Sequence, residues 1–155
     1  MPEKIQINEN KTLKLTNVLI REIHETELMD SNRFLVMMNN YILSKGTISK
    51  GPLVQFTSVS TNENGQPAII TKLMLQLQSD INIELPYVYK SMIKQENCLF
   101  ARFEEREEYL HLAYDKLIVY AFENDISLCG NNYTVYVERK ENNYITADIF
   151  MPIKR

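Results

Sequence analysis

The sequence predicts one α+β domain built from two copies of a strand–helix–strand–strand unit. The order of strand-like and helix-like patterns repeats once along the chain, and matching residues of the two halves are separated by a constant distance in the sequence. The length of 155 residues suits a single compact domain. We expect the halves to cover about residues 13–80 and 97–153, with a connector at residues 81–96 and a loose polar arm at residues 1–12.

The first half shows the whole pattern of the unit. Apolar and β-branched residues at 17–23 predict a strand. Residues 27–44 have helical spacing, with apolar side chains at intervals of three, four and seven: Leu28, Leu35, Met38 and Ile42. Residues 53–60 and 68–78 predict two further strands, and the sequence Asn-Glu-Asn-Gly at 62–65 predicts the turn that joins them.

The second half repeats this pattern after the connector. The Leu85-Pro86 pair interrupts any regular element in the connector and leaves room for a short helix after the proline. A strand at 97–103 and a helix at 105–123 follow. Two alternating segments, 133–139 and 144–153, predict the last two strands, with a turn at their junction.

Matching residues of the two halves share one offset. Tyr41 and Tyr120 differ by 79 positions, and so do Gly51 and Gly130. Because the chain has only four glycines, two at matched positions predict the same backbone requirement in both copies. Two such units joined edge to edge would form one antiparallel sheet with both helices on one face and a groove on the other, the expected binding site.

Composition and charge exclude several classes of protein. The net charge of −3 gives no basic face for nucleic acid. No apolar run approaches the roughly 20 residues that a membrane span needs, and the first residues lack the apolar segment of a signal peptide. Cys98 and Cys129 lack a CxxC context, so we expect reduced thiols in a cytoplasmic protein, with no metal and no cofactor.

Two segments carry a resemblance to a known family. Residues 108–117 have an acidic start followed by Ala-Tyr and a leucine, and residues 145–153 form an acid–aliphatic strand that closes on a proline. These segments resemble the GyrI-like domain, the effector-binding domain of AraC-type and multidrug-responsive transcription activators. Gly51-Pro52 resembles the family more loosely, so the likeness covers most of the chain. The sequence is also similar to stand-alone members from Gram-positive bacteria, some of them encoded beside secreted polymorphic toxins.

The resemblance implies a duplicated fold that takes small, often cationic and aromatic molecules in its groove. In the family an acid on the last strand faces the pocket, and the matching position here is Asp148. The family usually has a glutamate there, so the shorter aspartate puts the reach to a ligand cation in doubt. The chain leaves no room for a helix-turn-helix domain, so we expect a stand-alone binding domain that is a monomer or a homodimer.

Asp148 is the main candidate for ligand binding. It shares a strand face with Tyr144, Thr146 and Phe150, and a carboxylate among aromatic rings attracts a cation by charge and by cation–π contact. The alternative is an aspartate that simply faces solvent. The further candidates are aromatic, and core or loop packing is the alternative for each: Tyr133, Tyr136, Phe56 and Tyr89. Tyr133 and Tyr136 fall on opposite faces of their strand.

Three functions remain open from the sequence. The first is binding of a small aromatic or cationic molecule, and the second is an accessory role in which the chain binds a partner protein. The third is a small hydrolase that pairs Asp148 with Tyr136 or Tyr144. No GxSxG motif and no phosphate-binding glycine loop is present, so we expect no catalytic residue and a binding role.

The other charged residues favour structural roles. We expect Arg102 and Arg106 to pair with neighbouring glutamates. The acidic run at 104–108 is typical of a solvated first helical turn. His24 and His111 have no partner at metal-binding spacing and are expected to be surface residues.

Overall fold

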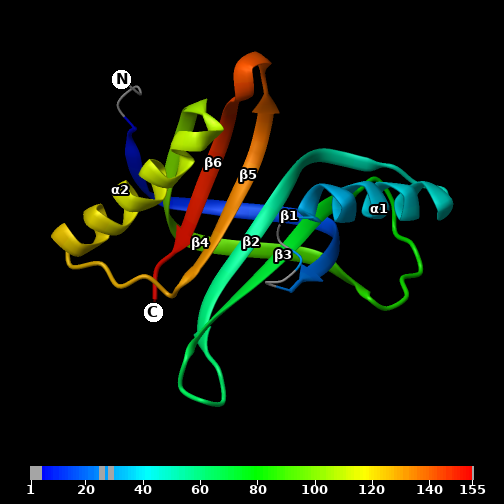
Figure 1. Cartoon of the computed structure of the whole chain (residues 1–155), viewed down its shortest axis with the longest axis horizontal. Coiled ribbons are helices and arrows are strands. Elements are labelled where there is room, and N and C mark those ends of the chain that lie inside the picture. Colours follow the sequence, from blue (N-terminus) through cyan, green and yellow to red (C-terminus); the bar gives the residue numbers. More distant parts are fainter. Residues whose placement is uncertain (1–4, 25–26, 28–29, 155) are drawn as a thin grey trace. The chain divides into compact units, whose positions relative to one another are not determined.

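Strands and helices are arranged in two similar runs along the chain in the computed structural model, which describes residues 5–24, 27 and 30–154 (Figure 1). In chain order the main elements are β1 (Ile7–Ile23), α1 (Ser31–Ser44), β2 (Ser49–Thr61), β3 (Pro67–Leu77), β4 (Tyr87–Arg106), η2 (Glu107–Tyr109), α2 (Leu110–Glu123), β5 (Asn131–Arg139), η3 (Glu141–Asn143) and β6 (Tyr144–Pro152). Neither helix of the described ranges is long and apolar enough to span a bilayer.

The chain forms two compact units. The first unit comprises residues 14–93, and the second comprises residues 94–155 with residues 1–13, as far as these are described. The boundaries lie within β1 and β4. Each unit has its own helix, its own three-stranded ladder and its own apolar core.

In the first unit, β3 pairs antiparallel with both β1 and β2, and α1 covers one face of the strands. The helix contributes every fourth side chain to the core, a spacing that keeps them on one helix face: Phe34, Met38 and Ile42. They pack against leucines and isoleucines that alternate along the strands: Leu19, Ile23, Leu73, Leu75 and Leu77. Leu28, which we expected to begin this apolar stripe, lies outside the described residues.

The second unit has the same topology. β6 pairs antiparallel with both β4 and β5, and α2 covers one face. The buried helix residues are Leu110, Ala113, Leu117 and Ala121. They pack against Leu99, Ala101, Phe103, Ile145, Ala147, Ile149 and Met151. The predicted α+β fold class and its repeated strand–helix–strand–strand unit are therefore confirmed.

The two glycines matched at an offset of 79 have the same backbone conformation. Gly51 has φ of 76° and Gly130 has φ of 92°, a left-handed region that costs a residue with a Cβ about 1–2 kcal/mol. Gly51 lies where the pairing of β2 with β3 shifts register, between Lys50 and Val54. The expected repeated backbone requirement is thus present in both units.

Three predicted boundaries are wrong, each because strand pairing extends further than the sequence pattern suggests. Residues 7–12, expected as a loose arm, belong to β1. Residues 87–96, expected in the connector, belong to β4, so no helix follows Pro86. Glu104 and Glu105 also belong to β4, where they face Thr146 and Ile145 across the ladder, so only Glu107 and Glu108 of the acidic run lie in the helical turn η2 that precedes α2.

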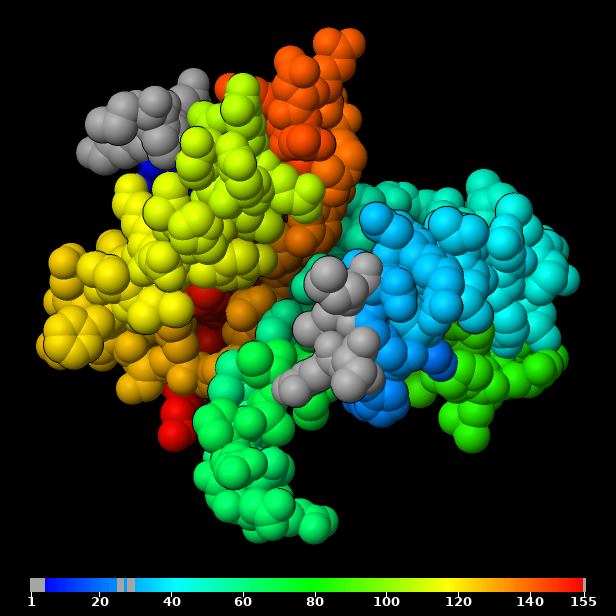
Figure 2. Space-filling view, in the orientation of Figure 1, coloured from blue at the N-terminus to red at the C-terminus, as the bar shows by residue number. Residues whose placement is uncertain are grey.

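The β2–β3 hairpin ends in the predicted turn. The side-chain Oδ1 of Asn62 accepts hydrogen bonds from the backbone N–H groups of Asn64 and Gln66, at 2.9 and 3.0 Å. Gly65 supplies the positive φ of 76° that the turn needs. The tip forms the green projection in Figure 2, and its residues 62–67 are exposed.

Candidate functional site

The candidate site lies on the strand face of the second unit that is opposite α2, here called the far face. Cross-strand register orders this face into four rows: Arg106 with Tyr144; Glu104 with Thr146 and Glu138; Arg102 with Asp148 and Val135; and Phe100 with Phe150 and Tyr133. Successive rows are two residues, or about 7 Å, apart along a strand. The predicted shared face of Asp148, Tyr144, Thr146 and Phe150 is present.

Asp148 is held by a bidentate ion pair with Arg102 from β4. The Nε of Arg102 donates to Oδ1 at 2.7 Å, and its Nη2 donates to Oδ2 at 2.9 Å. This hydrogen bond, followed by the attraction of the carboxylate, raises the pKa of Arg102. The predicted pairing of Arg102 with neighbouring glutamates is wrong, because Asp148 stands directly opposite in the ladder. Arg106 does lie near Glu108, with Nη1 3.9 Å from Oε1.

An aromatic row adjoins this ion pair. The rings of Phe100 and Phe150 meet edge to face with their centroids 5.0 Å apart, a favoured geometry for aromatic pairs. Tyr133 stands opposite Phe150 and is 5% exposed, and burial raises the pKa of its hydroxyl. The Nζ of Lys11 lies 5.5 Å from the centroid of the Phe100 ring.

Tyr136 and Tyr144 do not join Asp148. Tyr136 stands opposite Ala147 and packs against the core under α2, on the other face of the strands; burial strongly raises the pKa of its hydroxyl. Tyr144 shares the far face but lies four residues from Asp148 along β6, about 14 Å. The carboxylate–tyrosine pair that a hydrolase would need is therefore not assembled from these residues.

Phe56 and Tyr89 belong to the first unit. Phe56 stands opposite Lys72, whose Nζ lies 5.5 Å from the ring centroid. The hydroxyl of Tyr89 lies 2.6 Å from Oδ1 of Asn17 and 2.7 Å from Oδ1 of Asp80. The hydrogen bond to Asp80 raises the pKa of Tyr89.

The far face of the second unit has a counterpart in the first unit, with the charges inverted. Glu22 stands opposite Lys72 where Arg102 stands opposite Asp148. In the next row, the pair Ile20 and Met74 stands where the second unit has Phe100 and Phe150. Of these matched rows, those of the second unit combine a pair of phenylalanines with a neighbouring carboxylate on β6, whereas those of the first unit combine Ile20 and Met74 with a lysine on β3.

Two open pockets were not predicted. One, of about 450 Å³, is lined by Arg106, Glu107, Glu108, Asn142 and Asn143 at the Tyr144 end of the far face. The other, of about 400 Å³, lies in the first unit and includes Glu22, His24, Asn62 and Gln66. The Asn-Asn pair was a visible turn signal, but its left-handed φ values of 59° and 61° do not by themselves indicate a pocket.

Sequence reasoning also missed Phe100, Lys11 and the true partner of Arg102. Phe100 could have been found, because it lies two residues before Arg102 and so shares its strand face. Lys11 gave no signal, because the segment around it is polar and unpatterned. In the described part of the chain, no three His, Cys, Asp or Glu side chains are grouped so that they could hold a metal ion.

The two thiols are free and differ in access. Cys98 is fully buried, whereas Cys129 is exposed. Burial raises the pKa of Cys98 from its ordinary value of 9.0 to about 11. Between these values the folded state holds a proton that the unfolded state loses, so this group's contribution to the free energy of unfolding falls as pH rises through that window.

We expect only Cys129 to react with an aromatic disulfide reagent such as DTNB at pH 8. At that pH about one Cys98 thiol in a thousand would be ionised even if it were accessible. The measurement is the number of protein thiols that react with DTNB in native buffer and in guanidinium chloride. We expect one fast-reacting thiol per chain in native buffer and two in guanidinium chloride. A Cys129→Ser control should remove the fast equivalent, and two fast equivalents in the native protein would contradict the expectation.

No family model matches the chain, and no curated protein matches its sequence. Solved structures share its fold. EcmrR in a cryo-EM structure of its DNA complex has a TM-score of 0.71 at 11% identity, covering 98% of this chain and 57% of that one. The crystal structure of the EcmrR C-terminal domain has a TM-score of 0.62 at 12% identity, covering 98% of both chains.

Two further structures widen the range of proteins with this fold. SAV2435, solved bound to tetraphenylphosphonium, has a TM-score of 0.55 at 9% identity, covering 97% of this chain and 94% of that one. A protein from Listeria innocua described as a hydrolase has a TM-score of 0.53 at 11% identity, covering 99% and 93%. At these identities the comparisons establish the fold.

Proposed function

We propose that this chain, which has the GyrI-like α+β fold, binds a small aromatic organic molecule on the far face of its second unit. The observation that carries the proposal is the row of Phe100, Phe150 and Tyr133 beside the Arg102–Asp148 ion pair. Aromatic rings supply contact area for an aromatic molecule, and the charged groups of the adjoining row can fix its orientation.

The comparisons support a small molecule as the ligand class. SAV2435 has the same fold and was solved with tetraphenylphosphonium, a molecule built from phenyl rings. The hydrolase description of one Listeria innocua neighbour finds less support in this chain, because both oxygens of Asp148 already accept hydrogen bonds from Arg102. A carboxylate engaged in this way is poorly placed to act as a general base.

The proposal is tested with an uncharged aromatic probe, biphenyl-4-carboxamide, titrated into the full chain by calorimetry. We expect saturable binding that Phe150→Ala weakens about tenfold, because one aromatic contact contributes roughly 0.5–1.5 kcal/mol beyond its buried area. Val119→Ala is the matched control, since Val119 lies on α2 and is 52% exposed. Phe150→Leu, which keeps an apolar side chain at this position, separates loss of the ring from loss of folding. Absence of saturable binding, or equal weakening by Val119→Ala, would refute the proposal.

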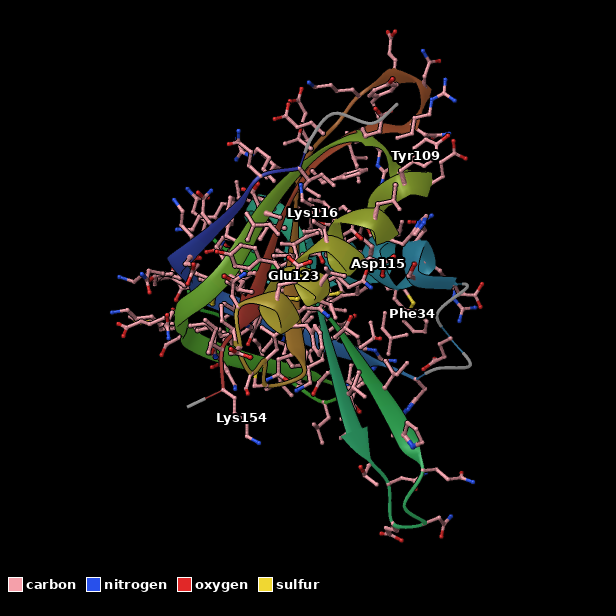
Figure 3. All side chains as sticks on the ribbon, turned by 90° about the vertical axis from the view of Figure 1, so that its left-hand side faces the viewer. Phe34, Tyr109, Asp115, Lys116, Glu123 and Lys154 are labelled. Atoms are coloured by element: carbon pink, nitrogen blue, oxygen red, sulfur yellow. The ribbon has the colours of Figure 1, made fainter. Side chains whose placement is uncertain are left out.

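A second candidate function is favoured by the outer surface of α2. The apolar side chains that this helix exposes include Ile118, Val119 and Phe122, the last of them 84% exposed. Figure 3 labels Asp115, Lys116 and Glu123 on this helix, and Tyr109 immediately before it. An exposed apolar stripe on a helix favours docking of a partner protein. If that partner is a second copy of the chain, light scattering should give a dimer mass for the wild type and a monomer mass for Phe122→Glu.

A further inference from the structure

We infer that the far face of the second unit selects an aromatic carboxylate over an aromatic cation, and that Arg102 determines this preference. The inference rests on the proposed function, because it names the charge of the molecule that the same face would bind. It differs from the cation-binding expectation drawn from the sequence, in which Asp148 is the group that meets the ligand.

The first step is that Asp148 is already neutralised by its own chain. Both of its oxygens accept hydrogen bonds from Arg102 in the side-on bidentate arrangement, at 2.7 and 2.9 Å. Such a pair has the planar match that makes Arg–carboxylate hydrogen bonds strong. To reach Asp148, a ligand cation would have to displace the guanidinium of Arg102, which belongs to the same chain. The positive charge of Arg102 would also repel the cation as it approached.

The second step is that the accessible member of the pair is the cation. The side chain of Arg102 is 51% exposed, whereas that of Asp148 is 14% exposed. The ion pair uses two of the five N–H groups of the guanidinium, which leaves three that point away from this carboxylate. A molecule arriving from solvent therefore meets N–H donors suited to a planar oxyanion.

The third step is that cationic side chains already accompany the aromatic rings. The Nζ of Lys11 lies 5.5 Å from the ring centroid of Phe100, and the guanidinium of Arg106 lies 5.9 Å from that of Tyr144. These are cation–π distances, so one face of the Phe100 ring and one face of the Tyr144 ring already have a cation of this chain beside them. Lys11 and Arg102 both place positive charge near the Phe100–Phe150 pair, which disfavours a second cation there.

The fourth step concerns the acids that face Arg102. Glu104 lies beside it on β4 and attracts it, and Glu138 shares the row of Glu104. Both acids lie one row beyond Arg102, on the side away from the phenylalanines. An aromatic carboxylate could therefore place its oxygens at Arg102 and its rings over Phe100 and Phe150, about 7 Å further along the strands, while remaining clear of the row that holds Glu104 and Glu138.

The test uses three probes of one shape and different charge: biphenyl-4-carboxylate, biphenyl-4-carboxamide and biphenyl-4-carboxamidine, titrated into the full chain by calorimetry. We expect the carboxylate to bind at least about tenfold more tightly than the amidine, with the neutral amide between them, since hydrogen bonds to a charged group are worth roughly 1.5–3 kcal/mol. Tighter binding of the amidine would overturn the inference and leave the proposed function standing. Absence of binding by all three would overturn both.

Substitutions at Arg102 and Asp148 test which residue determines the preference for a carboxylate. Arg102→Gln should weaken the carboxylate at least about tenfold and weaken the amide by a clearly smaller factor. Asp148→Asn should leave carboxylate binding equal or tighter, because it frees the guanidinium, whereas a cation site would lose its amidine. Arg102→Lys, which keeps the charge without the planar fork, should retain part of the preference. Amide binding that persists in Arg102→Gln shows that the glutamine variant is folded. Unchanged carboxylate affinity in Arg102→Gln would contradict the assignment.

Discussion

Replacing Phe103 by alanine is expected to lower the free energy of unfolding by about 3–5 kcal/mol. Phe103 is fully buried among the strand and helix residues of the second unit's core and is among the largest of the fully buried side chains. Removing its ring takes away the apolar contacts and leaves a cavity that the rigid ladder of β4 with β6 closes poorly. Urea denaturation followed by circular dichroism measures the loss as a shift of the midpoint at constant slope.

The same chain offers a matched control for this variant. Phe122 lies on the outer side of α2 and is 84% exposed, so Phe122→Ala removes the same atoms from solvent-exposed surface. At a protein concentration at which the chain is monomeric, we expect its free energy of unfolding to change by no more than about 0.5 kcal/mol. Equal losses in the two variants would contradict the assignment of Phe103 to the core.

Replacing Gly51 by alanine is expected to cost about 1–2 kcal/mol of unfolding free energy, the second-largest effect among the single substitutions proposed for stability. Its φ of 76° is unfavourable for any residue with a Cβ. An added Cβ would lie 3.4 Å from Nε2 of Gln76, an ordinary van der Waals contact. The expected cost therefore comes from the backbone conformation.

Gly51→Asn distinguishes backbone strain at positive φ from steric clash of the added side chain. Asparagine tolerates the left-handed region better than alanine, so its smaller loss in stability, despite a bulkier side chain, would identify φ as the cause. Gly130→Ala should give a loss of the same sign, because Gly130 has a φ of 92°. The midpoint temperatures of thermal unfolding of these variants and of the wild type measure the losses. Alanine variants as stable as the wild type would contradict the requirement for positive φ at both sites.

Much of the fold was predictable because local pattern and tertiary structure agree. The helices bury the side chains that recur every three or four residues, and the strands bury alternate ones. The offset of 79 between Gly51 and Gly130 reflects a shared φ, which only glycine adopts freely. The ends of β1 and β4 were not predictable, because polar residues such as Lys11 and Glu104 give no strand signal and are held by pairing with partners distant in the sequence.

For the candidate site, the sequence predicts which residues share a strand face, but it does not predict which residues they contact on the neighbouring strand. Alternation places Asp148, Tyr144 and Phe150 on one side of β6. The partner of Asp148 depends on the register between β4 and β6, and a change of two residues would have placed Phe100 or Glu104 opposite it instead of Arg102. Charge complementarity between two strands therefore becomes visible only once their register is known.

The inverted pairs Glu22–Lys72 and Arg102–Asp148 bear on stoichiometry. A chain whose two units carried the same residues at these positions would offer two equivalent binding sites and bind two molecules. Here the first copy carries lysine where the second carries aspartate, and Ile20 with Met74 where the second has its phenylalanines. If the proposed site lies on the second unit, these differences predict that one molecule binds per chain, and calorimetric saturation is expected at a single equivalent.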